Sequence, residues 1–317
     1  MATSDAAILD VYAVRPEAPR LTRWRRSLFT FARTKPLGFF GLCVVMLLLF
    51  IAAFPGLFAT HSPTPAPPPI LERLQGPSAE HWMGTDQFGR DVYSRIIYGA
   101  RTSIVIGFLV VAVSAVIASF LGIVSGYFGG WFDILVQRLV DIGISLPGLI
   151  FIILVVTTLT QFPPSWMGLS PAQGTVMRIA VTLGILVALG SSRVIRGSAI
   201  TVKQNQYVEA ARVVGAGDGR IIRSHILPNV FAIILVGASI QVGGAILTES
   251  ALAFLGYGVE PPTPSWGLML NEAREELSRY PHLAIFPGLA IFFTVYSFNM
   301  LGDALRDVLD PRLRGSR

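Results

Sequence analysis

The residues best suited to chemistry are few and scattered along the chain. None of the four histidines stands at metal-ligand spacing from another. They are His61, His81, His225 and His282. The single cysteine, Cys43, lies in an apolar run and excludes an intramolecular disulfide or a cysteine-based metal cluster. No nucleophile, base and orienting group can be assembled from spacing. The sequence therefore predicts neither catalysis nor a metal site.

A phosphate-binding loop is also missing from the sequence. No Gly-x-x-x-x-Gly-Lys-Ser/Thr stretch occurs, so the chain has no nucleotide cradle of its own. We expect no bound cofactor, and any ATP-derived energy must come from a partner.

The composition indicates a membrane protein. Of 317 residues, 52% are hydrophobic and only 14% are charged, with a mean hydropathy of +0.61. A net charge of +6 could indicate nucleic-acid binding, but most basic residues lie in short segments beside apolar runs. That arrangement reflects membrane topology, so we expect no nucleic-acid partner.

Six apolar stretches are long enough to cross a bilayer as helices. They are 37–58, 103–125, 137–160, 176–196, 230–256 and 283–302. The third contains Asp141 near one end and Pro147 within it, so its bounds are the least sharp. The prediction is an all-α polytopic membrane protein with six transmembrane helices.

Loop charge predicts the orientation. The tail 1–36 has seven Lys or Arg residues and the segment 193–229 has six, whereas the loop 257–282 is net negative. By the positive-inside rule the tail and 193–229 face the cytoplasm, and 59–101 and 257–282 face outward. Six spans return the C-terminal tail, 304–317, to the cytoplasm.

One carboxylate lies inside a predicted span. Placing Glu249 there costs about 2.5–3.5 kcal/mol on insertion scales, so we expect it to face the bundle interior or water. It could line a translocation path or gate. Alternatively, it makes a helix–helix hydrogen bond near the outer interface.

A charged segment, 207–229, interrupts the apolar spans. Good helix formers over 205–214 are followed by Gly215, a natural stop. Asp218 suits the N-cap of a second short helix, which Pro228 should end near the bilayer. We expect two short helices across the cytoplasmic side, with an apolar stripe that includes Val213 and Ile222. A loop resting on lipid headgroups is the simpler alternative.

Several motifs resemble one transporter family. Glu209-Ala210-Ala211, three residues, Gly215, nine residues and then "HILP" at 225–228 resemble the "EAA" motif of type I ABC importer permeases. The "HILPN" form is similar to the peptide and nickel branch. Three further stretches resemble the C-type subunits of dipeptide and oligopeptide permeases. They are "HWMGTDQFGRDVYSRIIYGARTS" at 81–103, "TESALAFLGYGVEPPTPSWGLML" at 248–270 and "DALRDVLDPRLRG" at 303–315.

The resemblance implies a MetI-like bundle in a bacterial or archaeal inner membrane, with a cytoplasmic coupling helix. It implies a non-catalytic permease subunit paired with a second, different permease. Two cytoplasmic ABC ATPases and an extracytoplasmic substrate-binding protein would complete an importer for di- or oligopeptides. Nickel and glutathione remain alternative cargoes. More distant alternatives are an ion-coupled carrier, for which Asp141, Pro147 and Glu249 are weak candidates, and a membrane scaffold that only docks a partner.

The resemblance also assigns regions and residues. It divides the chain into the tail 1–36, a first span 37–58, an extracytoplasmic loop 59–100, a core 101–303 with a coupling element at 203–229, and the tail 304–317. The implied ATPase-coupling residues are Tyr207, Glu209, Ala210, Ala211, Gly215, Arg220, His225, Leu227 and Pro228. The extracytoplasmic or interfacial candidates are Asp86, Arg90, Asp91 and Trp266. The first three could cap and orient a short interfacial helix running to Tyr98, or contact the binding protein.

Overall fold

The computed structural model describes residues 29–64, 72–159 and 168–309, and these ranges are predominantly helical. The main helices are α3 (Pro36–Ala53), α4 (Val92–Phe128), α5 (Gly130–Ser145), α6 (Gly148–Leu159), α7 (Pro171–Lys203), α8 (Gln206–Val213), α9 (Asp218–Ile221), α10 (Leu227–Phe254), α11 (Trp266–Glu272) and α12 (His282–Leu309). A 3-10 turn, η1 (Pro55–Leu57), follows α3, and a π-helical turn, η4 (Ile222–Ile226), joins α9 to α10.

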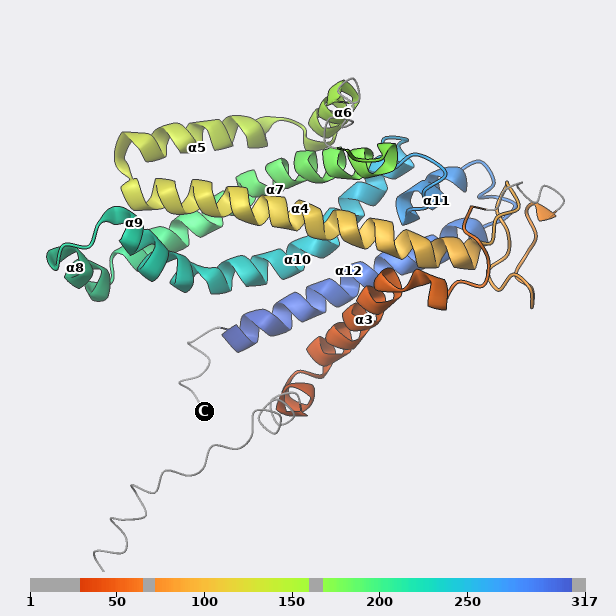
Figure 1. Ribbon diagram of the computed structural model, residues 1–317, viewed down its shortest axis with the longest axis horizontal. Coiled ribbons are helices and arrows are strands. Elements are labelled where there is room, and N and C mark those ends of the chain that lie inside the picture. The colour runs from red at the N-terminus through yellow and green to blue at the C-terminus, as the bar shows by residue number, and fades with distance from the viewer. Residues whose placement is uncertain (1–28, 65–71, 160–167, 310–317) are drawn as a thin grey trace, which may run out of the picture.

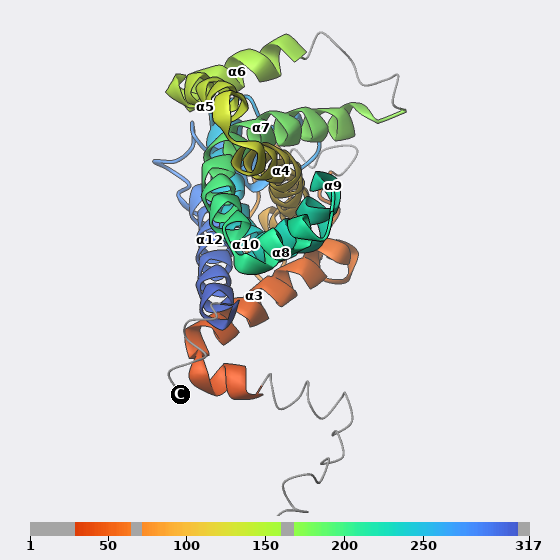
Figure 2. The same ribbon diagram turned by 90° about the vertical axis from the view of Figure 1, so that its left-hand side faces the viewer.

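The long helices form one bundle with two distinct ends. The α8–α9 pair makes up one end, and α11 with the loops before α4 lies at the other (Figure 1). We call these the α8–α9 end and the α11 end. Viewed from the α8–α9 end, α3 and α12 lie together on one side of the bundle and α5 and α6 on the other (Figure 2).

The predicted all-α polytopic membrane fold is confirmed. Within the described ranges, α3, α4, α7, the continuous unit Asp218–Phe254 and α12 are long and apolar enough to span a membrane. The α5–α6 pair would be a sixth span, but it is bent by 91°.

Over its described residues, the stretch predicted as a span at 137–160 therefore falls on two helices, α5 and α6, and not on one continuous helix. The residue before a proline is disfavoured in helical conformation, and Leu146, which precedes Pro147, is extended with ψ 138°. The bend lies at Leu146 and Pro147, between α5 and α6.

The short interfacial helix was predicted to end at Tyr98, and that end point is wrong. Asp91 caps α4, and the helix then runs without interruption to Phe128. The interfacial helix and the span predicted at 103–125 are one element, because no proline or turn sequence separates Tyr98 from Ser103.

Small residues bring α4 and α7 close together. A Cβ atom added at Gly122 would lie 2.6 Å from the Ser192 carbonyl oxygen, and one at Gly126 would lie 2.9 Å from the Arg196 carbonyl oxygen. Close approach at glycines is a common way to pack membrane helices. The pair forms the rigid centre against which the α8–α9 end is built.

Candidate functional site

The first helix of the predicted coupling element is α8, and few of its residues are buried. Val208 is its one buried residue, whereas Tyr207, Glu209 and Ala210 are exposed. The apolar residues at its C-terminal end are highly exposed: Val213 is 87% exposed and Val214 is 88% exposed. Val213 therefore lies outside the buried apolar stripe in which the sequence placed it.

A glycine turn ends α8. Gly215 has φ +90°, a left-handed conformation that glycine adopts without steric cost, and the amide of Ala216 donates back to the carbonyl of Ala211. Gly217 then occupies the N-cap of α9, with Arg220 donating to its carbonyl. Asp218 is thus the first residue of α9 and not its cap, which leaves its carboxylate available for another partner.

Pro228 was predicted to end the second short helix, but the helix continues through it. The preceding turn widens to a π-helix in which the Leu227 amide donates to the Ile222 carbonyl, five residues back. Widening of this kind re-satisfies backbone groups next to a proline. The Asn229 side chain also donates to the His225 carbonyl at 2.6 Å. The α9 helix therefore continues through the π-helical turn into α10.

A tyrosine at the end of α4 fixes the coupling element in place. The Tyr127 hydroxyl donates to the Asp218 carboxylate at 2.5 Å and accepts from Arg212 at 3.4 Å. Lys203, at the end of α7, donates to the Tyr127 carbonyl. Ile221 and Ile226 are fully buried in the cluster that contains Tyr127. The residue Tyr127 thus connects α4 with α7, α8 and α9.

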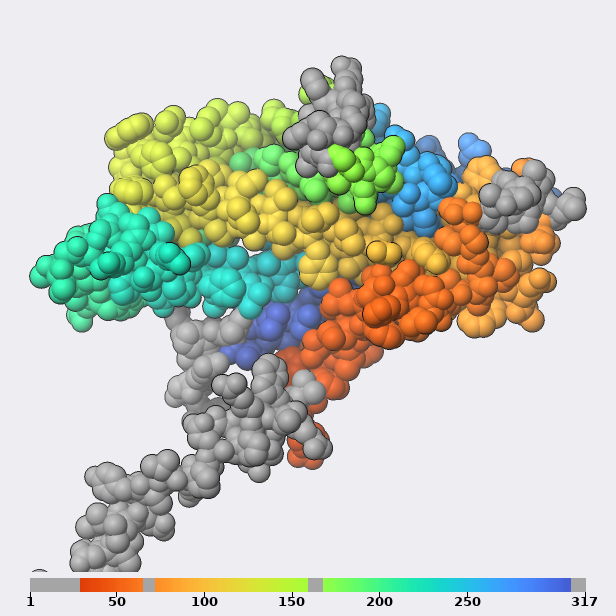
Figure 3. All heavy atoms as spheres, in the orientation of Figure 1, coloured from red at the N-terminus to blue at the C-terminus, as the bar shows by residue number. Residues whose placement is uncertain are grey.

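The predicted coupling residues lie together on this protruding end (Figure 3). Two of them, Tyr207 and His225, are in ring contact with centroids 6.0 Å apart. Ala211 and His225 are half-buried, and the others are exposed: Tyr207, Glu209, Ala210, Gly215, Arg220, Leu227 and Pro228. Most of the set is therefore available to a partner.

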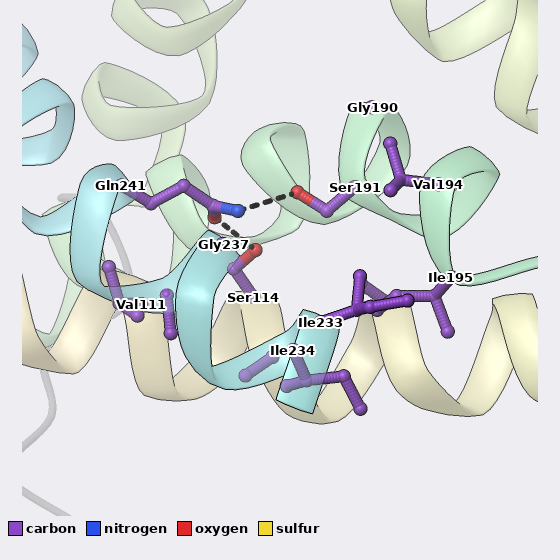
Figure 4. A pocket seen from close by; sticks show the side chains of 13 residues that line it. Val111, Ser114, Gly190, Ser191, Val194, Ile195, Ile233, Ile234, Gly237 and Gln241 are labelled. Carbon is purple, nitrogen blue, oxygen red and sulfur yellow. Dashed lines mark hydrogen bonds between the residues drawn. The ribbon is translucent and has the colours of Figure 1, made fainter. Parts of the chain in front are cut away.

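A pocket of about 220 Å³ opens between α4, α7 and α10. The Gln241 amide nitrogen donates to the Ser191 hydroxyl at 3.1 Å, and its oxygen accepts from Ser114 at 3.3 Å (Figure 4). The remaining lining is small and apolar: Val111, Ala115, Ala118, Gly190, Val194, Ile195, Ile233, Ile234, Gly237 and Ala238. The polar side chains of Gln241, Ser191 and Ser114 can exchange hydrogen bonds with a ligand amide.

Glu249 lies apart from this pocket. It is fully buried, and Ser250 donates to its Oε2 atom at 3.4 Å. It stands eight residues beyond Gln241, or about 12 Å along α10. The start of α11 packs closely beside it, since a Cβ atom on Gly267 would lie 2.6 Å from the Ser250 Cα atom. Of the two roles predicted for Glu249, this position favours helix packing.

The predicted interfacial residues at the α11 end are buried. Asp91 accepts a hydrogen bond from the Ser94 amide at 2.8 Å as the cap of α4. The Trp266 indole donates to the Ile96 carbonyl at 3.0 Å. These contacts position α4 and α11, and little of either side chain remains for another protein to touch.

Asp86 and Arg90 belong to a buried ion cluster. Its other two members, Arg95 and Glu272, were not among the residues singled out from the sequence. Arg90 pairs with Asp86 at 2.7 Å and with Glu272 at 2.9 Å. Arg95, which is 1% exposed, pairs with the same two carboxylates. Two positive and two negative charges thus join the loop before α4 to α11. Arg95 sits on the predicted helix, but nothing in its spacing identifies Glu272 as its partner.

Sequence comparison identifies the family. A profile described as "Binding-protein-dependent transport system inner membrane component" matches residues 118–315. The chain belongs to this family. It is 38% identical over 291 residues to the dipeptide transport system permease protein DppC of Alkalihalophilus pseudofirmus, which covers 92% of this chain and 90% of that protein. It is 42% identical over 240 residues to the glutathione transport system permease protein GsiD of Pectobacterium atrosepticum. This match covers 76% of this chain and 75% of that protein.

Structural comparison agrees with the fold of this permease. A crystal structure of an amino acid ABC transporter with histidines aligns with a TM-score of 0.50 and 16% identity, covering 68% of this chain and 94% of that one. The chain is thus a multi-pass permease subunit of an ABC importer, and subunits of this kind are normally non-catalytic.

The contact that Tyr127 makes between α4 and the predicted coupling element can be tested by mutation. Tyr127→Phe removes one hydrogen bond to Asp218 and one to Arg212, a loss of about 1–3 kcal/mol of local stability. We expect the complex to assemble but to transport severalfold less substrate per ATP hydrolysed. Paired ATPase and uptake assays measure that ratio. Tyr93→Phe, at the other end of the same helix, is the control. An unchanged ratio for Tyr127→Phe contradicts the connection.

Glu249 provides a second test within the permease. If the carboxylate only packs helices, Glu249→Gln keeps the shape and the hydrogen bond from Ser250, and uptake stays within about twofold of wild type. Glu249→Leu removes that bond and should lower the yield of folded chain. A tenfold loss of uptake by the glutamine variant, with normal assembly, would instead assign Glu249 to the path.

Proposed function

We propose that this chain is one of two different permease subunits of an ATP-driven importer that carries small peptides across the inner membrane. The observation that carries the proposal is the α8–α9 end, where Val213 and Val214 are almost fully exposed on an element fixed to the bundle by Tyr127. Exposed apolar side chains on a rigid support are typical of a protein-binding surface. We define this surface by Tyr207, Glu209, Val213 and Val214 and call it the docking surface.

The docking surface is proposed to face the cytoplasm and to bind one of two ABC ATPase subunits. Basic residues concentrate in the segment 193–229 and in the tail 1–36, which supports a cytoplasmic position for both and for the C-terminal tail. ATPase closure would push α8, and because α9 is continuous with α10, the displacement passes to a span as a rigid-body movement. No ATP chemistry is required of this chain.

The pocket between α4, α7 and α10 is proposed to form part of the translocation path with the second permease. Gln241 and two serines offer both donors and acceptors, which match the N–H and C=O groups of a peptide backbone. The lining residues include no histidine, cysteine or carboxylate, so the pocket favours peptides over a nickel ion. The names of the DppC and GsiD relatives support a dipeptide or glutathione-sized peptide. An extracytoplasmic binding protein would deliver it.

Reconstitution tests this function. The chain is purified with its partner permease and ATPases, placed in liposomes, and supplied with the cognate binding protein and radiolabelled dipeptide or glutathione. We expect uptake that requires both ATP and the binding protein. Uptake driven by an ion gradient without ATP would contradict the proposal and support the carrier alternative.

A further inference from the structure

Three residues with metal-binding atoms meet at the α11 end of the bundle, outside the docking surface and the pocket. His61 follows the η1 turn after α3, His81 lies in the loop before α4, and Asp91 caps α4. One ligand atom from each lies within 4.8 Å of the other two. These two histidines are twenty positions apart in the sequence, so sequence spacing gave no sign that the fold brings them together.

The distances suit a small divalent ion. The Nδ1 atom of His81 lies 2.9 Å from Asp91 Oδ1, and the Nδ1 atom of His61 lies 3.9 Å from Asp91 Oδ2. Ligand atoms about 2.0–2.1 Å from a tetrahedral Zn²⁺ ion are about 3.3 Å from one another. The His81 distance is close to that value, whereas the His61 distance runs to the other carboxylate oxygen. A shift of the His61 ring toward Asp91 Oδ1 would bring all three ligand atoms onto one ion, since one ligand atom from each residue already lies within 4.8 Å of the other two.

Other groups hold the three ligands in place. The Ser94 amide donates to Asp91 Oδ2 at 2.8 Å, which leaves Oδ1 as the inner oxygen. The Ser94 hydroxyl accepts from the His61 amide at 2.9 Å, so the same serine positions two ligands. The Glu72 carboxylate lies 3.6 Å from His81 Nε2. A carboxylate near the second ring nitrogen is the usual support for a histidine that binds metal through the first.

Burial and charge favour a cation here. The side chain of Asp91 is 1% exposed and that of His81 is 6% exposed, so this carboxylate is removed from water. Among the described residues, the ion pairs of Asp91 are with His61 and His81, and no arginine or lysine pairs with it. The Ser94 amide at the start of α4 stabilises this carboxylate in part, and a bound cation would compensate its charge directly. The His61 side chain is 38% exposed, which provides a route for an ion and room for water as a fourth ligand.

We propose that His61, His81 and Asp91 bind one divalent transition-metal ion, of the Zn²⁺ type, and thereby fasten the segment leaving α3 to the start of α4. Two imidazole nitrogens and one carboxylate oxygen form a donor set that Zn²⁺ commonly uses. The site is independent of the cargo, so its test does not involve transport.

The experiment measures Zn²⁺ bound to the full-length chain purified in detergent with a histidine-free affinity tag. We expect one Zn²⁺ per wild-type chain after dialysis, and a rise in melting temperature when Zn²⁺ is added. His61→Gln should weaken Zn²⁺ binding at least about tenfold and remove the thermal shift. Asp91→Asn should do the same while still capping α4, because asparagine is a good N-cap.

The two remaining histidines supply matched controls. His225→Gln and His282→Gln change the same residue type outside the site and should bind Zn²⁺ like the wild type. If the wild type binds no stoichiometric Zn²⁺, the cluster is a hydrogen-bonded histidine–aspartate group and the proposal fails. It fails equally if His61→Gln and Asp91→Asn retain wild-type affinity, which would mean an adventitious ion only.

Discussion

Replacing Val213 and Val214 together by aspartate is expected to release the ATPase subunits from an otherwise intact permease. Both side chains are almost fully exposed, so the core loses nothing when they change. Two carboxylates at the end of α8 would have to be desolvated on docking, and they also oppose the partial negative charge of that helix end. Burying two unpaired carboxylates at a protein interface is costly, so we expect at least about a tenfold loss of ATPase binding.

Co-purification of ATPase with the tagged permease measures this effect, with uptake as the second readout. Leu277→Asp is the matched control, because Leu277 is 50% exposed in the segment after α11, at the opposite end of the bundle. The control should retain wild-type ATPase content. Normal ATPase content in the double aspartate variant would mean that the docking surface lies elsewhere.

Arg95→Met is expected to give the largest loss of stability. Arg95 is buried between Asp86 and Glu272, and its removal leaves two carboxylates sharing Arg90 alone. Breaking a buried ion cluster by removing one partner costs about 3–5 kcal/mol. We expect a sharply lower melting temperature in detergent and a low yield of folded chain.

The matched control is Arg101→Met, which removes the same charge from an exposed position on the same helix. It should melt close to wild type. Adding Glu272→Gln to Arg95→Met removes one unpaired charge and should recover part of the lost stability, which a double-mutant cycle would quantify. Wild-type melting of Arg95→Met would show that the cluster contributes nothing to the fold.

Much of this architecture was predictable because lipid imposes simple rules. Apolar length was enough to anticipate the long helices, and the "EAA" motif was enough to locate the α8–α9 end. Local chemistry was less reliable. Pro147 accompanies a bend because Leu146 adopts an extended conformation, whereas Pro228 is tolerated because a π-helical turn precedes it. A proline by itself does not distinguish these outcomes.

The contacts that organise the site depend on the packing of distant segments. Tyr127 reaches Asp218 only because α4 ends where α9 begins, at the same end of the bundle, and Gln241 bonds to serines on two other helices. The pairing of His61 with His81 likewise requires a long loop to return to the start of α4. No spacing rule encodes such proximity.

Disulfide crosslinking in native membranes tests the central claim most directly. Val214→Cys is made in a Cys43→Ser background, with Leu277→Cys in the same background as the control, and each ATPase carries a single cysteine beside its predicted docking groove. The account predicts a permease–ATPase crosslink from position 214, weakened or shifted by ATP, and none from position 277. If position 214 gives no crosslink while the complex remains assembled, the α8–α9 end is not the ATPase contact.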